Sequence, residues 1–190
     1  NIYRPKRPGS FWVRTTGLGS YREVGRACHL VTTNESRIMI DVGINIASDT
    51  DPMPFFTAPE ALPMEKLDAV ILTHAHLDHA GMLPVLFKYG YRGPVYCTPP
   101  TRDLMLLLQS DYLKIGGAEG KRAPYDMEDI RTCMRHVIDV DWGQTVDIAP
   151  DAKLTFHNAG HIIGSSSVHL HIGDGKHNIV FSGDQKYEKS

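Results

Sequence analysis

Apolar residues occur along the chain in short runs that glycines and polar residues interrupt. In the segments 37–41 and 68–73 most positions are apolar, which is typical of strands in a buried sheet. Runs of this kind predict strands over 11–16, 27–33, 37–41, 68–73, 136–140, 152–157, 167–172 and 178–182.

Helical spacing of apolar residues predicts helices over 81–89, 101–115 and 126–135. We expect Asp126 to open the last of these helices, and the segment 98–101 to cap the middle one. Strands, then helices, then strands follow one another without strict alternation. This order predicts an α+β fold, in which helices pack outside sheets, rather than a doubly wound parallel sheet.

The composition is that of a globular domain. Of the 190 residues, 42% are hydrophobic and 22% are charged, values that argue against a disordered, collagen-like or membrane-spanning chain. The formal net charge of −2 gives no general attraction to a polyanion, so a nucleic-acid site would have to be local. Residues 1–10 are basic and proline-rich and are interpreted as a linker, a solvated tail or the end of a preceding module. Residues 11–190 are predicted to form the domain.

Three cysteines, Cys28, Cys97 and Cys133, lie far apart in the sequence. Their spacing excludes a thiolate zinc site and a disulfide framework, which favours a reducing, cytoplasmic setting. The sequence begins at Asn1 and shows no signal or transit peptide, so we interpret it as an excised or processed piece.

The strongest chemical signal is the segment His74-Ala75-His76-Leu77-Asp78-His79. In extended backbone, residues i and i+2 face the same side, so His74 and His76 can point at one metal ion. The turn into the following helix would bring Asp78 and His79 to a neighbouring position. Burying three imidazoles and a carboxylate together is costly unless a cation or full hydrogen bonding compensates. The donor types favour a pair of zinc ions over copper–thiolate or calcium–oxygen chemistry.

Two later residues fit the same site. His161 follows Gly160 after the strand predicted over 152–157, and Asp184 follows the strand predicted over 178–182. Both stand at the carboxyl end of an apolar strand, and a carboxylate such as Asp184 can bridge two cations. A capping or turn role for either residue stays open.

The remaining histidines are expected to be packed or solvated. This applies to His29, His136, His157 and His177. His169 and His171 stand at i and i+2 of a predicted strand, as His74 and His76 do, but no carboxylate accompanies them, so a structural role is predicted.

The order of these motifs resembles the metallo-β-lactamase superfamily. The segments 16–26, 95–104 and 183–188 are more narrowly similar to the β-CASP ribonucleases, and among them to archaeal homologues of the cleavage and polyadenylation specificity factor. The resemblance runs from about Phe11 to Ser190. It implies an αββα sandwich, of which this chain would be the N-terminal portion, without the β-CASP insertion and the C-terminal part.

The resemblance also assigns roles to residues. It implies that His74, His76 and His161 hold one zinc ion, that Asp78 and His79 hold the other, and that Asp184 bridges both. A further histidine of the family's second site falls beyond Ser190, so we expect the second ion to bind this chain weakly or not at all. Asp41 would orient the metal ligands, although a role as a turn former before Gly43 stays open. The family usually carries an aromatic residue where Gln185 stands.

The expected activity is hydrolysis of RNA phosphodiesters by a zinc-dependent endonuclease, with 5′-to-3′ exonuclease activity as an addition. Two metal ions would activate water, and Asp78 would hold its proton as general base. The setting would be RNA 3′-end processing or transcription termination. Expected partners are RNA, the transcription or RNA-processing machinery and, in the full-length protein, a second copy, with no membrane. Two alternatives stay open: a small-molecule ester or thioester hydrolase of the same superfamily, and a non-catalytic RNA-binding module in this truncated form.

Overall fold

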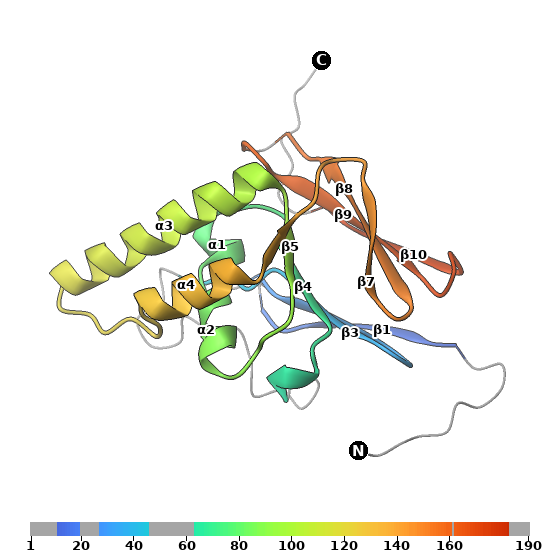
Figure 1. The fold of residues 1–190 in the computed structure, drawn as a ribbon, viewed down its shortest axis with the longest axis horizontal. Coiled ribbons are helices and arrows are strands. Elements are labelled where there is room, and N and C mark those ends of the chain that lie inside the picture. Colours follow the sequence, from blue (N-terminus) through green and yellow to red (C-terminus); the bar gives the residue numbers. More distant parts are fainter. Residues whose placement is uncertain (1–10, 20–26, 46–62, 161, 183–190) are drawn as a thin grey trace.

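The computed structural model describes residues 11–19, 27–45, 63–160 and 162–182. Two β-sheets face each other, and the α-helices cover the outer face of the larger sheet (Figure 1). The described residues therefore form three layers, helix, sheet and sheet. The predicted α+β class is confirmed.

The larger sheet has six strands in the order in which they occur along the chain. These strands are β1 (Val13–Gly17), β2 (His29–Thr33), β3 (Arg37–Ile40), β4 (Ala69–Ile71), β5 (Val95–Cys97) and β6 (Val137–Asp139). Strands β1 to β3 pair antiparallel, whereas β3 to β6 pair parallel. Parallel neighbours require crossover connections, and helices supply two of them.

The first helical crossover, between β4 and β5, contains α1 (Leu77–Ala80) and α2 (Leu83–Lys88). The second, between β5 and β6, contains α3 (Pro99–Ala118) and α4 (Met127–Arg135). A short 3-10 helix, η1 (Met64–Lys66), precedes β4. No described helix has the length and apolar character needed to cross a membrane.

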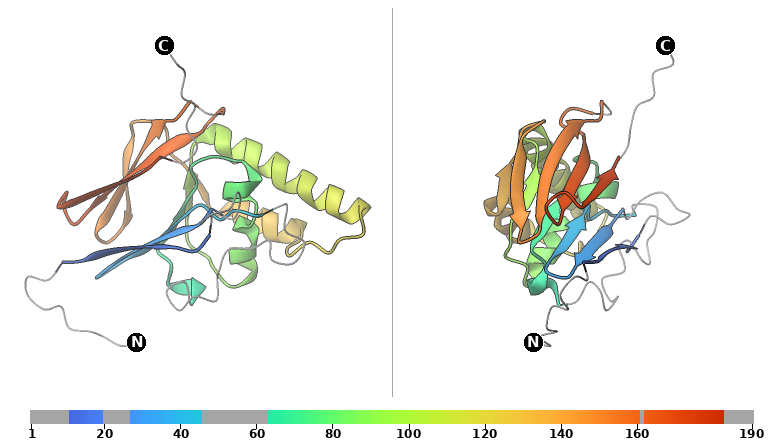
Figure 2. Two further views of the ribbon diagram at one scale, coloured as in Figure 1. Left: turned by 180° about the vertical axis from the view of Figure 1, so that it is seen from behind. Right: turned by 90° about the vertical axis from the view of Figure 1, so that its right-hand side faces the viewer.

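The smaller sheet has four antiparallel strands in the order β10-β9-β8-β7. Its members are β7 (Thr145–Ala149), β8 (Ala152–Asn158), β9 (Ser166–Ile172) and β10 (His177–Phe181). Figure 2 shows it packed across the larger sheet, on the side opposite to the helices. In strands, alternate residues face opposite sides. Leu154, Phe156, Val168 and Leu170 accordingly point into the core between the sheets.

The central strands of the larger sheet are buried on both faces. Ile38 and Ile40 of β3 pack between the two sheets, while Met39 packs against the helices. In β4, Ile71 likewise packs between the two sheets and Val70 packs against the helices. This double burial explains why the sequence runs continuously apolar there.

Several element boundaries differ from the sequence-based predictions. Strands β5 and β7 were not predicted, because β5 has only three residues and β7 lies on the solvated edge of its sheet. The helix predicted over 81–89 is present as α2, with bounds two residues later at its start and one residue earlier at its end, but the short helix α1 before it was not predicted. A Cβ at Gly81 would lie 2.5 Å from both Ile44 Cγ2 and the Leu77 carbonyl oxygen, so this glycine permits Ile44 to pack closely against the end of α1.

The two predicted helix caps have different outcomes. Asp126 opens α4 in a capping box, in which its carboxylate accepts from the Asp129 N–H at 2.9 Å and the Asp129 carboxylate accepts from the Asp126 N–H at 3.0 Å. Thr98 stands at the N-cap position of α3, but its side chain makes no capping hydrogen bond. Its hydroxyl donates instead to the Gly164 carbonyl oxygen at 2.7 Å.

Candidate metal centre

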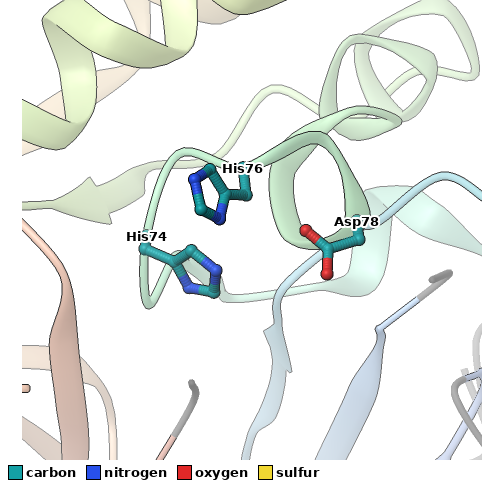
Figure 3. Close-up of side chains that lie close together, drawn as sticks. All are labelled: His74, His76 and Asp78. Atoms are coloured by element: carbon teal, nitrogen blue, oxygen red, sulfur yellow. The ribbon is translucent and has the colours of Figure 1, made fainter. Parts of the chain in front are cut away.

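Three potential metal ligands converge just after strand β4. One donor atom from each of His74, His76 and Asp78 lies within 4.8 Å of the others, and Figure 3 shows the three side chains grouped at the turn into α1. Among the described residues, no other group of three such donors is this compact. Two imidazole nitrogens and a carboxylate oxygen suit a borderline divalent ion such as zinc.

The prediction that His74 and His76 extend a strand is wrong in detail, because β4 ends at Ile71. The residues after it form an irregular turn, and His76 is the N-cap of α1. His74 is buried, whereas His76 and Asp78 are partly exposed. The group is therefore buried at His74 and accessible to solvent at His76 and Asp78.

His79, the fourth residue of the motif, lies beside this group. Its ring centroid is 4.0 Å from that of His74, and its Nε2 atom is 3.6 Å from Asp78 Oδ2. Its Nδ1 atom lies 2.7 Å from Asp41 Oδ2. A carboxylate can only accept, so His79 donates through Nδ1–H, and a neutral His79 ring, the form that binds metal, carries its lone pair on Nε2, the atom nearer Asp78.

Asp41 is the centre of a buried network that also orients His74. Its carboxylate accepts the Thr73 N–H and the Thr73 hydroxyl, each at 2.8 Å. Because the Thr73 hydroxyl has donated its only proton, it accepts from His74 Nδ1–H, 2.9 Å away. His74 therefore also carries its ligand lone pair on Nε2. Carboxylate–histidine pairs of this type raise the basicity of metal ligands and fix their orientation.

The backbone of Asp41 also has the conformation expected of a turn former. Its φ angle is +60°, in the left-handed region that asparagine, aspartate and glycine tolerate best. Asp41 is thus both the residue that turns the chain after β3 and the one that holds Thr73 and His79. The two interpretations left open by the sequence are compatible.

The segment after Asp41 fixes the backbone of α1. Val42 N–H donates to the His79 carbonyl oxygen at 2.7 Å, and Ile44 N–H donates to that of Leu77 at 2.8 Å. Between them, a Cβ at Gly43 would lie 1.6 Å from the Asp78 carbonyl oxygen. Only glycine permits this approach, so Gly43 helps to set where Asp78 lies.

The other end of α1 is held from the helical layer. Gln109 of α3, which is fully buried, donates to the Ala80 carbonyl oxygen at 2.9 Å. The Tyr125 hydroxyl donates to the Gly81 carbonyl oxygen at 2.7 Å. A four-residue helix leaves its last carbonyl groups without intrahelical partners, and these two side chains satisfy them. Asp78 and His79 are therefore carried on a helix that is anchored at both ends.

The predicted ligands His161 and Asp184 lie outside the described residues, as do residues 1–10 and Gln185. The chain on both sides of position 161 is described, however. Ser166 N–H donates to the Thr73 carbonyl oxygen at 2.7 Å, directly before His74. Gly164 lies against the start of α3, where its carbonyl oxygen accepts the Thr98 and Thr101 hydroxyls. The chain just after position 161 therefore lies next to Thr73, the residue that precedes His74.

The histidines expected to be packed or solvated have ordinary surroundings. His136 Nδ1 lies 2.8 Å from the Thr132 carbonyl oxygen, and the His177 ring stacks on Phe11 with 5.1 Å between centroids. His157 is exposed. Partial burial lowers the pKa of His29 by more than the nearby carboxylate of Asp41 raises it, so the neutral form of His29 is favoured. The three cysteines are buried free thiols.

Sequence reasoning did not find Thr73, Gly43, Gln109 or Tyr125 as parts of the centre. Thr73 directly precedes His74 and could have been suspected from its position alone. The roles of Gln109 and Tyr125 depend on contacts with residues 29 and 44 positions away, which no local pattern encodes.

Comparison with known proteins agrees with this geometry. The sequence model for the metallo-beta-lactamase superfamily domain matches residues 30–189. The chain therefore belongs to the metallo-beta-lactamase superfamily. Solved structures support the fold: the Rm3 metallo-beta-lactamase has a TM-score of 0.55 at 21% identity and covers 87% of this chain and 56% of that one. The metallo-beta-lactamase fold protein YhfI from Bacillus subtilis has a TM-score of 0.58 at 20% identity, and the match covers 93% of this chain and 64% of that chain.

Curated relatives are more similar in sequence. The transcription termination factor FttA of Methanosarcina mazei is 59% identical over 189 residues, which is 100% of this chain and 30% of the relative. The protein of the same name from Methanocaldococcus jannaschii is 57% identical over 96% of this chain and 28% of its own length. The protein of the same name from Thermococcus kodakarensis is 54% identical over 98% of this chain and 30% of its own length. The chain thus spans about 30% of the length of these archaeal relatives, which agrees with the archaeal branch indicated by the sequence motifs.

Proposed function

We propose that this chain carries the metal-binding part of the active site of a zinc-dependent ribonuclease that acts in transcription termination or RNA 3′-end processing. The observation that carries the proposal is the convergence of His74, His76 and Asp78 at the end of β4. The name of the archaeal relatives supports the termination setting. Endonuclease cleavage is the main activity proposed, with 5′-to-3′ exonuclease activity as an addition.

In this proposal His74, His76 and His161 hold one zinc ion, Asp78 and His79 the second, and Asp184 bridges them. The 3.6 Å between Asp78 Oδ2 and His79 Nε2 supports their assignment to one ion, and the place of Asp78 within the His74–His76 group supports a second ion close to the first. The hydrogen bond from Ser166 N–H to the Thr73 carbonyl oxygen supports His161, since it holds the chain five residues after position 161 next to Thr73. Since the resemblance implies one further ligand of the second site beyond Ser190, we expect the second ion to bind this chain weakly or not at all.

The residues of the chain have distinct tasks. Asp41 and Thr73 keep the Nε2 lone pairs of His74 and His79 available as ligands. Asp78, partly exposed at the first turn of α1, can accept the proton of an attacking water as general base. Bound zinc ions would supply an activated water and neutralise charge on the phosphoryl oxygens.

The protein in which this chain acts is proposed to bind RNA and the transcription machinery, to form a homodimer and to work in the cytoplasm. The resemblance to archaeal β-CASP ribonucleases supports the binding of RNA and of the transcription machinery. Three free thiols support a reducing compartment.

A chimera provides the full-length context for a test. This chain would replace the matching 189 residues of the Methanosarcina mazei relative, to which it is 59% identical. We expect zinc-dependent cleavage of end-labelled RNA that His76→Ala and Asp78→Ala each abolish, while His177→Ala, on the smaller sheet, leaves it unchanged. Unchanged cleavage in both centre variants would disprove the metal mechanism. A chimera that hydrolyses small esters and leaves RNA intact, with no salt dependence of binding, would favour the small-molecule hydrolase.

A further inference from the structure

The outer face of the smaller sheet carries a group of histidines that the metal centre does not use. His157 of β8 and His169 and His171 of β9 alternate with the inward residues Phe156 and Leu170, and therefore face away from the core. The described α-helices all pack on the far side of the larger sheet, as Figures 1 and 2 show. Among the described residues, no helix covers this face.

His169 and His171 are already arranged as a pair. Their rings stack with 3.9 Å between centroids, and the ring of His157 is 6.0 Å from that of His169. His169 Nε2 lies 3.2 Å, and His171 Nδ1 lies 3.1 Å, from one atom, the Oδ1 of Asn178 on β10. Asn178 is the residue opposite His171 in the pairing of β9 with β10. Two imidazole nitrogens and an amide oxygen thus converge on one position.

The same contacts allow the pair to change from donors to ligands. An amide oxygen only accepts, so without a metal ion both His169 Nε2 and His171 Nδ1 donate an N–H to Asn178 Oδ1. A metal ion bound at His171 Nδ1 would move that proton to Nε2, which lies 3.1 Å from the Thr155 hydroxyl oxygen, an acceptor for it. His169, bound through Nε2, would carry its proton on Nδ1. Each ring then keeps one proton on the nitrogen that faces away from the ion.

We propose that His169, His171 and Asn178 form a second, independent site for a divalent ion of the copper, nickel or zinc type. Imidazole suits these ions, and a neighbouring amide oxygen can complete the set. Lys153 of β8 stands opposite His171, but its ammonium group pairs with Asp147 at 3.9 Å. A bound ion would join β9 to β10, the strand from which the chain continues toward Asp184.

Calorimetric titration of this chain with Ni²⁺ tests the site. We expect two binding events, a tighter one at the His74–His76–Asp78 centre and a weaker one at His169 and His171. In the double variant His169→Gln/His171→Gln we expect the affinity of the weaker event to fall at least about tenfold, while the tighter event is unchanged. His76→Gln does the reverse. Asn178→Asp strengthens the weaker event about tenfold, because a carboxylate replaces a neutral oxygen.

His177→Gln is the matched control. His177 belongs to the same sheet and is next to Asn178, but its ring stacks on Phe11, so its loss should leave both events unchanged. Circular dichroism of each variant should match the wild type, because the substituted side chains face outward. If the double variant and the wild type give the same two events, the proposal is wrong. This outcome is separate from the ribonuclease assay, which depends on the other centre.

Discussion

The carboxylate of Asp41 and the imidazole of His79, 38 residues apart in sequence, are joined by a hydrogen bond of 2.7 Å between Oδ2 and Nδ1. Both side chains are buried. This contact links the end of β3 to the helix that follows β4, and so connects a backbone turn to the orientation of a predicted ligand. It makes Asp41 the first target for mutation.

Asp41→Asn should weaken metal binding by about ten- to a hundredfold, the usual cost of removing a carboxylate behind a histidine ligand. Asparagine tolerates the φ angle of +60°, so the turn should survive. Zinc competition titrations against a chromophoric chelator measure the change. Asp41→Ala is the companion variant: it adds backbone strain and should lower the melting temperature further. Wild-type affinity in Asp41→Asn would show that the network does not tune the ligands.

Gly43→Ala should displace α1 and destabilise the fold. The added Cβ would lie 1.6 Å from the Asp78 carbonyl oxygen, a contact that only a backbone shift can relieve, and overpacking of this kind costs about 1–3 kcal/mol or more. Urea unfolding measures the loss. Gly117→Ala in α3 is the control, because nothing lies within 4 Å of the added Cβ. There alanine should stabilise by about 0.5–1 kcal/mol.

Tyr125→Phe should remove the hydrogen bond that holds the Gly81 carbonyl oxygen at 2.7 Å. A buried carbonyl that loses its partner costs about 1–3 kcal/mol, so we expect a lower free energy of unfolding and a smaller loss of zinc affinity than in Asp41→Asn. Tyr112→Phe deletes a hydroxyl from the neighbouring ring, 6.1 Å away, and serves as the control. Equal stability of the two variants would contradict a role for Tyr125 in anchoring α1.

The capping box of α4 should make stability depend on pH. The backbone N–H of Asp129 lowers the pKa of Asp126, so the ionised cap stabilises the native state above the usual aspartate pKa. This contribution is lost as the pH falls through the lowered value. The melting temperature of Asp126→Ala should therefore lie below that of the wild type at pH 7, and the gap should narrow toward pH 3. A constant gap would argue that charge at the cap is irrelevant.

The three thiols should be unreactive in the folded protein. Burial raises the pKa of Cys97 to about 12, and it raises those of Cys28 and Cys133 as well. At pH 8 a disulfide reagent should therefore modify none of them until the protein is unfolded, when all three react. Fast labelling of one thiol in the native state would reveal local opening around it.

The sequence alone determined the elements that depend on local pattern. Continuous apolar runs identified β3 and β4 because both of their faces are buried. The spacing of His74, His76, Asp78 and His79 identified the candidate centre because four donors lie within six residues. The cap at Asp126 followed from its place before α4. These features rest on neighbours within one or two turns of the chain.

Only the tertiary structure decided how the centre is held together. Asp41 reaches His79, Tyr125 reaches Gly81, and Ser166 reaches Thr73 through hydrogen bonds between segments that are far apart in sequence. The side chains of His169 and His171, which looked structural in the sequence, converge on Asn178 because β9 pairs with β10 in a particular register. Pairing and packing between distant strands set such contacts, and no local sequence pattern encodes them.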